Sequence, residues 1–132
     1  MRNIDPSLLA LLAEVHKAYV AIPERFRWEA SIDVLTRVVA RIVPGVTAVN
    51  GQLHDQEEHS WLITESPDRH VIDIFPRYHY PGPLLVDTYL IRNAGWYVPS
   101  SKQTKSGDRM FASHVEEIAD ATEGAKRFLG MP

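Results

Sequence analysis

The sequence contains no cysteine among its 132 residues. This absence excludes disulfide bonds, metal sites built on thiolates, and catalysis by a cysteine nucleophile of this chain. Any covalent chemistry at a site would therefore need another nucleophile.

Long apolar runs and an excess of one charge are also missing. The longest apolar stretch near the start, Leu8 to Leu12, is far shorter than the roughly 20 residues that a membrane-spanning helix needs. The net charge is −3, and no long cluster of lysine and arginine occurs. We therefore expect neither a membrane nor a nucleic acid as partner. No secretion signal is recognisable, so the cytoplasm is the expected location.

The remaining composition is that of a folded protein. Hydrophobic residues make up 45% of the chain and charged residues 23%, which is usual for globular proteins and unlike disordered ones. The length fits a single domain over residues 1–132, because single cores typically span roughly 100–150 residues. A monomer and a homo-oligomer are both compatible with this composition.

Apolar residues at helical spacing predict three helices. The first, over residues 6–20, has a capping residue and a proline at its start. The second, largely buried, covers about residues 29–43 and ends at Pro44-Gly45. The third closes the chain, from residue 110 or 111 to residue 129.

Between the second and third helices the pattern changes to short, strand-like apolar runs. The predicted strands cover residues 46–49, 60–64, 70–75, 84–86 with 89–91, and 95–98. Turn-forming residues at 65–69 can join the second and third of these as an antiparallel hairpin. The order predicts an α+β fold, with N-terminal helices packed on a mainly antiparallel sheet of four to five strands and a C-terminal helix. Residues 100–108 are predicted as an exposed loop.

The residues with the clearest chemical meaning are His59 and Asp73, one on each strand of the predicted hairpin. Both lie at comparable distances from the turn, so the hairpin can bring them together. A carboxylate beside an imidazole fixes its tautomer and favours its charged form, as a catalytic base requires. A purely structural pair, or two unrelated surface residues, is the alternative interpretation. Trp61 would share the face of His59, either as packing or as a platform for a ligand.

Two short motifs carry a resemblance to a known family. His59-Ser60-Trp61-Leu62 and Val71-Ile72-Asp73-Ile74 resemble the last two catalytic elements of the transglutaminase-like branch of the papain-like cysteine hydrolases. In that family a nucleophilic cysteine begins a buried helix, and a His-x-Trp strand and an Ile-Asp strand follow. The resemblance covers about residues 26–90 and implies a peptide or protein ligand in a cleft between the second helix and the strands. The cysteine would fall near Arg27-Trp28-Glu29-Ala30-Ser31, where none is present.

The missing cysteine leaves three hypotheses. The leading one is a catalytically silent or diverged transglutaminase-like domain that acts as a peptide-binding, protein-binding or regulatory module, with Arg27 near the place of the cysteine. The second is an amide or ester hydrolase in which His59 is the base, Asp73 orients it, and Ser31 or a metal-activated water attacks. The third is a structural protein in which the pair matters only for folding.

Two further segments gather polar or aromatic side chains. His54 to His59 holds two imidazoles and three carboxylates, and Asp73 could complete a metal-binding set with the two histidines. A solvated acidic loop is the favoured interpretation, because no standard ligand spacing occurs, and we predict no cofactor. Tyr78 and His79 lie in a proline-rich loop that could line a ligand groove, although a rigid loop packed over the sheet end is the more usual arrangement.

Overall fold

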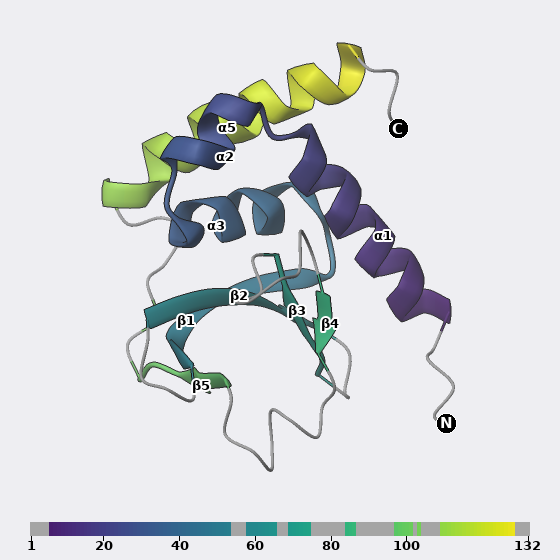
Figure 1. The fold of residues 1–132 in the computed structure, drawn as a ribbon, viewed down its shortest axis with the longest axis vertical. Helices are drawn as coiled ribbons and strands as arrows, with labels where there is room; N and C mark the ends of the chain where they lie inside the picture. The colour runs from purple at the N-terminus through teal and green to yellow at the C-terminus, as the bar shows by residue number, and fades with distance from the viewer. Residues whose placement is uncertain are drawn as a thin grey trace.

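The helices and strands follow one another in the predicted order, except that a short helix over residues 24–29, which was not predicted, comes after the first helix (Figure 1). The structure is a computed structural model that describes residues 6–53, 58–65, 69–74, 84–86, 97–101, 103 and 109–128. The helices are α1 (Pro6–Ala21), α2 (Glu24–Glu29), α3 (Ile32–Ile42) and α5 (Arg109–Phe128). The strands are β1 (Val46–Leu53), β2 (Glu58–Thr64), β3 (Val71–Asp73), β4 (Leu84–Val86) and β5 (Tyr97–Pro99).

The first and last predicted helices are confirmed as α1 and α5. The prediction of one helix over residues 29–43 was wrong at its start, because α2 ends at Glu29 and α3 begins only at Ile32. Ser31 has an extended backbone, and its side chain accepts a hydrogen bond from the Val34 N–H. This N-cap ends any continuous helix through Ser31. No helix within the described residues has the length and apolar character that crossing a membrane requires.

The described strands form one antiparallel sheet in the order β4-β3-β2-β1-β5. The predicted α+β class is confirmed. β1 is longer than predicted, because Asn50 to Leu53 continue it and hold β5. Among the predicted strand residues, Phe75, the run 89–91, Gly95 and Trp96 lie outside the described residues. Of the predicted loop 100–108, only Ser100, Ser101 and Gln103 are described.

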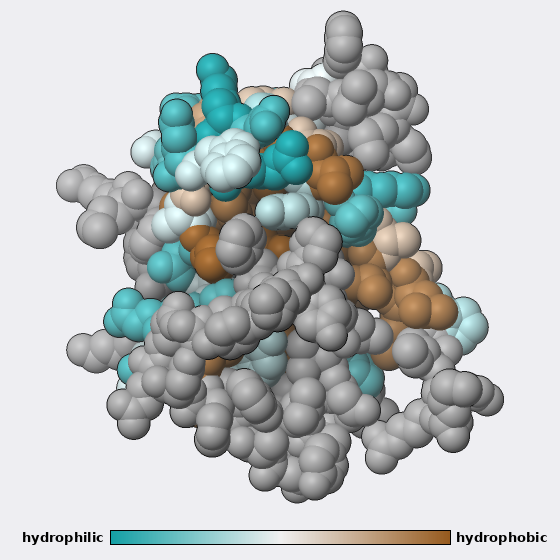
Figure 2. Space-filling model, in the orientation of Figure 1, coloured by the Kyte–Doolittle hydropathy of each residue, from teal (hydrophilic) through white to brown (hydrophobic). Residues whose placement is uncertain are grey.

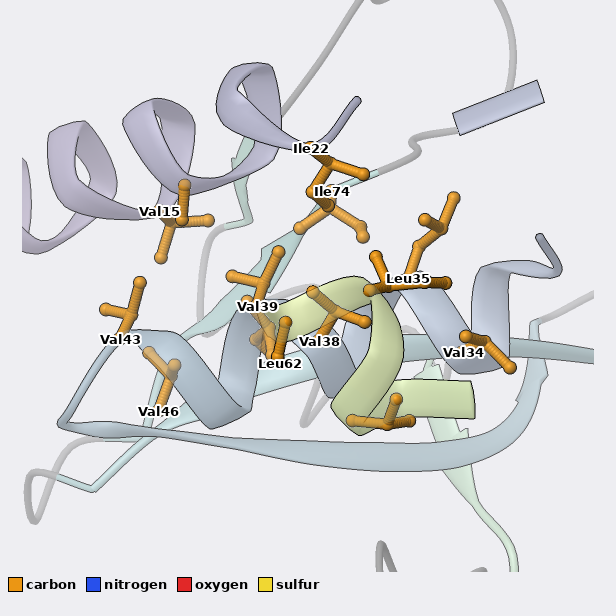
Figure 3. Packing of buried hydrophobic residues seen from close by; sticks show 14 of the residues in the cluster. Val15, Ile22, Val34, Leu35, Val38, Val39, Val43, Val46, Leu62 and Ile74 are labelled. Atoms are coloured by element: carbon orange, nitrogen blue, oxygen red, sulfur yellow. The ribbon is translucent and has the colours of Figure 1, made fainter. Parts of the chain in front are cut away.

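The main core lies between the helices and one face of the sheet. Helix α3 runs along the sheet, with α5 across its other side, so Val34 to Val39 are all buried. The apolar side chains of α1, α3, β1, β2 and the end of β3 converge there (Figure 3). In the space-filling view, hydrophilic side chains cover α2, whereas hydrophobic ones reach the surface along α1 (Figure 2).

Gly45 makes the turn from α3 into β1. Its φ of 94° lies in the left-handed region that side chains with a Cβ atom rarely adopt. The turn lets β1 run back beneath the helix that it follows, and it places the start of β1 next to the end of β2, where Val46 pairs with Thr64.

Candidate functional site

One face of the sheet carries the helices, and the other face carries three of the predicted site residues, His59, Trp61 and Asp73. Side chains alternate between faces along a strand. Leu62 packs in the helix-side core, and the Ser60 hydroxyl donates a hydrogen bond to the Asp33 carboxylate of α3. His59 and Trp61 therefore point to the opposite face.

Asp73 of β3 lies on the same face as His59. Because Ile72 pairs with Leu62, the next position along the hairpin sets Asp73 across from Trp61 and diagonal to His59. The imidazole Nε2 lies 2.8 Å from Asp73 Oδ2 and 3.0 Å from Oδ1. His59 is only 7% exposed and Asp73 only 1%. The predicted proximity of these two side chains is confirmed.

A third side chain, Tyr97 of β5, joins this pair. Its hydroxyl donates a hydrogen bond of 2.9 Å to Asp73 Oδ2. Burial, the negative charge of Asp73 and this hydrogen bond together raise the pKa of Tyr97 above its ordinary value. The phenol therefore stays protonated and remains a donor at neutral pH. We refer to His59, Asp73 and Tyr97 as the His59 cluster.

Trp61 packs against this cluster. Its ring stacks on the His59 ring with centroids 6.4 Å apart and planes inclined by 27°. It meets the Tyr97 ring edge-on at 5.1 Å and 71°. Trp61 is 1% exposed and forms a second apolar cluster with Val71. Its place in the structure is that of a packing residue, which was one of the two roles expected for it.

The His59 cluster fixes the orientation and the tautomer of the imidazole. Within the described residues, the hydrogen bonds of His59 are all made at Nε2, to the two oxygens of Asp73. The proton on Nε2 is therefore held by Asp73, and Nδ1 is the nitrogen left for proton exchange. A histidine held in this way has the geometry of a base whose orienting carboxylate is in place.

Ser31 lies at the start of α3 and Arg27 in α2, so neither is on the sheet that carries the His59 cluster. The Ser31 Oγ accepts a hydrogen bond of 3.2 Å from the Val34 N–H at the start of α3. Ser31 and Arg27 line one cavity together, whereas His59 lines another. The sequence placed Ser31 one turn inside a helix, but it is the capping residue before the first turn. The structure does not bring Ser31 or Arg27 together with the His59 cluster.

Three predicted positions, His54, Tyr78 and His79, lie outside the described residues. Within the part of the chain that is described, no group of three or more histidine, aspartate and glutamate side chains is arranged to hold a metal ion.

A polar cavity of about 390 Å³ lies beside the pair, between the start of α3 and strands β1, β2 and β5. The residues that line it are Asp33, Asn50, Gly51, Gln52, Glu58, His59, Val98, Pro99 and Ser100. We call it the polar cavity. A cleft between this helix and the strands was expected, and His59 and Glu58 were recognised in the sequence, but Asp33, Asn50 and Gln52 were not.

A buried arginine organises the helix side of the polar cavity. Arg37 of α3 donates from Nη1 to the Asp33 carbonyl oxygen at 2.8 Å and from Nη2 to Asn50 Oδ1 at 3.3 Å. Its Nη1 also lies 3.8 Å from the Asp33 carboxylate. The Asp33 carboxylate thus lies near the positive charge of Arg37 and accepts a hydrogen bond from the Ser60 hydroxyl. Glu58 is exposed, and its carboxylate makes no side-chain hydrogen bond or salt bridge within the described residues.

Comparisons with protein-family models, with curated proteins and with solved structures gave no match. The two motifs around His59 and Asp73 therefore carry the family resemblance by themselves.

Proposed function

We propose that this chain is a catalytically silent, diverged transglutaminase-like domain that binds a peptide or protein segment in the polar cavity. The observation that carries the proposal is the buried, hydrogen-bonded pair of His59 and Asp73 in a chain without a single thiol. The cytoplasm is the location that we expect for this module, and this expectation rests on the sequence alone.

The silent role follows from the missing nucleophile. A histidine base accelerates acyl transfer only when a nucleophile lies within hydrogen-bond reach of it. Ser31 engages its hydroxyl as the cap of α3 and lines a separate cavity. The His59 cluster then acts as a buried polar anchor that ties β2, β3 and β5 together.

The lining of the polar cavity favours a cationic segment as ligand. Arg37 offsets part of the charge of the half-exposed Asp33, whereas Glu58 has no salt-bridge partner within the described residues, so Glu58 supplies most of the negative charge that is open to a ligand. Gln52 adds an exposed side-chain amide, which can pair with a peptide backbone. A lysine or arginine side chain beside ordinary peptide groups is the chemistry that complements this surface.

An amide or ester hydrolase is the second candidate function. The observation that favours it is the orientation of His59, whose Nε2 is held by Asp73 while Nδ1 is left for proton transfer. This candidate requires a nucleophile to reach Nδ1, for which a bound water activated by a metal is one chemical route. It predicts turnover that depends on His59, which the silent role does not.

Peptide binding is tested by NMR titration with two short probes, acetyl-Gly-Lys-Gly-amide and acetyl-Gly-Glu-Gly-amide. We expect the lysine peptide to shift the backbone resonances around the polar cavity at millimolar concentration. Glu58→Gln should weaken this binding by about fivefold, because an exposed ion pair contributes up to about 1 kcal/mol. Glu117→Gln removes an exposed carboxylate on α5 and should leave the binding unchanged.

Equal shifts with the lysine and glutamate peptides would contradict the proposed ligand chemistry. An absence of shifts around the polar cavity with both peptides would overturn the binding role itself.

A further inference from the structure

A second hollow in the surface lies where the end of α1, helix α2 and the start of α3 meet. It has a volume of about 610 Å³, and Tyr19, Glu24, Arg27, Trp28 and Leu35 are among the residues that line it. We call it the Arg27 groove. It shares no lining residue with the polar cavity, so an inference about it does not rest on the proposed function.

Arg27 is a cation without a counter-charge. Its Nε is buried and has no hydrogen-bond partner, and the guanidinium makes no salt bridge within the described residues. Its guanidinium lies over the face of the Tyr19 ring, whose centroid is 6.0 Å from the guanidinium carbon. By contrast, Arg37 and Arg41 each have a carboxylate within reach. A desolvated Nε–H group of this kind lacks the acceptor that buried donors normally have.

Glu24, the acidic side chain among the described residues that line the groove, does not pair with Arg27. Glu24 lies one turn before Arg27 on α2, yet its Oε1 accepts a hydrogen bond of 3.4 Å from the indole N–H of Trp28. Glu24 and Arg27 form no salt bridge within the described residues. The groove therefore offers a guanidinium fork to an anion that comes from outside the chain.

Apolar and aromatic surface lies next to this cation. Leu35 is buried at the base of the groove, and Tyr19 is half-buried along it. Trp28, at 80% exposed, is the most exposed large apolar side chain among the described residues. Hydrophilic side chains otherwise cover the surface over α2 (Figure 2). The exposed indole of Trp28 is therefore an apolar group within a polar surface. Aromatic residues beside an arginine are typical of positions that dominate binding to a partner.

We propose that the Arg27 groove binds the C-terminal carboxylate of a peptide that ends in an apolar residue. The carboxylate accepts two parallel hydrogen bonds from the two Nη groups of Arg27, a bidentate geometry in which arginine recognises carboxylates well. The apolar last side chain packs toward Leu35, and the preceding residue covers Trp28. A free small acid would satisfy Arg27 but would leave the exposed indole uncovered, so a peptide chain complements the groove better.

The direct test uses one peptide in two forms, acetyl-Ala-Leu-Phe with a free carboxylate and the same tripeptide with a C-terminal amide. Binding to the whole chain is followed by NMR shifts of residues in α2 and at the start of α3. We expect the free acid to bind about tenfold more tightly than the amide, because charge-assisted bidentate hydrogen bonds are lost in the amide. 3-Phenylpropionate, a small acid of the same chemistry, is expected to bind more weakly than the peptide acid.

Variants locate the site. Arg27→Met should reduce the affinity for the free acid about tenfold and make acid and amide equivalent, while Arg27→Lys, a point charge without the fork, should recover only part of the preference. Trp28→Ala changes an exposed side chain and should weaken both forms without affecting folding. Arg25→Met is the matched control, because Arg25 is an exposed neighbour that stacks on Phe26 and does not line the groove. It should leave affinity unchanged.

Equal binding of acid and amide by the wild-type chain, or no shift in α2 with either form at millimolar concentration, would overturn the inference. Tighter binding of 3-phenylpropionate than of the peptide acid would assign the groove to a small molecule instead of a peptide. Neither result bears on the polar cavity, whose probe is a cationic peptide.

Discussion

At the scale of single residues, Tyr97 extends the His59–Asp73 pair to three hydrogen-bonded side chains. A carboxylate with two donors, the imidazole Nε2–H and a phenol, is a satisfied buried group. Tyr97 comes from a strand 24 residues further along the chain, so the cluster also joins β5 to the middle of the sheet.

The raised pKa of Tyr97 predicts a pH effect on stability. In the unfolded chain the phenol loses its proton at about pH 10, whereas the folded form keeps it because of burial and Asp73. The free energy of unfolding should therefore fall as the pH rises above about 10. Tyr97→Phe removes this part of the decline, and at neutral pH it costs about 1 kcal/mol for the lost hydrogen bond.

Urea denaturation at a series of pH values measures both effects. Tyr19→Phe leaves Tyr97 in place and should retain the steeper decline. If Tyr97→Phe and the wild-type chain lost stability equally above pH 10, the hydrogen bond to Asp73 would not be present in solution.

At the scale of elements, the approach of β5 to β1 depends on one glycine. Gly51 of β1 pairs with His59 on one side and Pro99 on the other. A Cβ atom at this position would overlap the Val98 carbonyl oxygen and lie 2.8 Å from Trp61 Cη2. The absence of a side chain is therefore what allows β5 to carry Tyr97 to Asp73.

Gly51→Ala should destabilise the fold by about 1–3 kcal/mol, because the added methyl group overpacks a closed contact. Gly124→Ala is the matched control. Gly124 lies on the exposed side of α5 with no atom near the Cβ position, so alanine there should stabilise the fold by about 0.5–1 kcal/mol through its better helix propensity. Midpoints of urea unfolding give both values, and a neutral Gly51→Ala would show that β5 does not pack as described.

The periodicity of apolar residues predicted most helices and strands but not where they begin and end. Each of the helices α1, α3 and α5 buries one face, so its apolar residues recur at helical spacing. This spacing can be read within the segment itself. The interruption between α2 and α3 depends on one side chain, that of Ser31, which caps α3. The spacing of apolar residues across 29–43 gives no sign of this interruption. The polar half of β1 was missed because Asn50 to Leu53 gain their strand structure from pairing with β2 and β5.

The contacts of the site that form within one hairpin were predictable from the sequence, whereas the long-range contacts were not. His59 and Asp73 lie on strands joined by a short turn, so the local chain brings them together. Tyr97 and the Asp33–Ser60 contact join segments far apart in the sequence, and no pattern within either segment indicates its partner. The groove around Arg27 depends in the same way on how α1, α2 and α3 pack.

At the scale of the whole molecule, the sheet separates two environments. The helices cover one face, with an apolar core between them and the sheet. The other face carries the His59 cluster, against which Trp61 packs. The two hollows differ in charge, since Glu58 faces one and Arg27 the other. Both hollows lie at the start of α3, which contributes Asp33 to the first and Ile32 and Leu35 to the second.

The most direct test of this account is a hydrolysis assay on the wild-type chain, His59→Ala and Ser31→Ala, each shown to be folded by circular dichroism. The substrates are 4-nitrophenyl acetate and an acetylated peptide 4-nitroanilide. The account predicts that the wild-type rate equals the buffer rate and that neither variant changes it, with Ser31→Ala costing only about 1 kcal/mol of stability for its lost helix cap. Hydrolysis by the wild-type chain that disappears in folded His59→Ala would contradict the silent role.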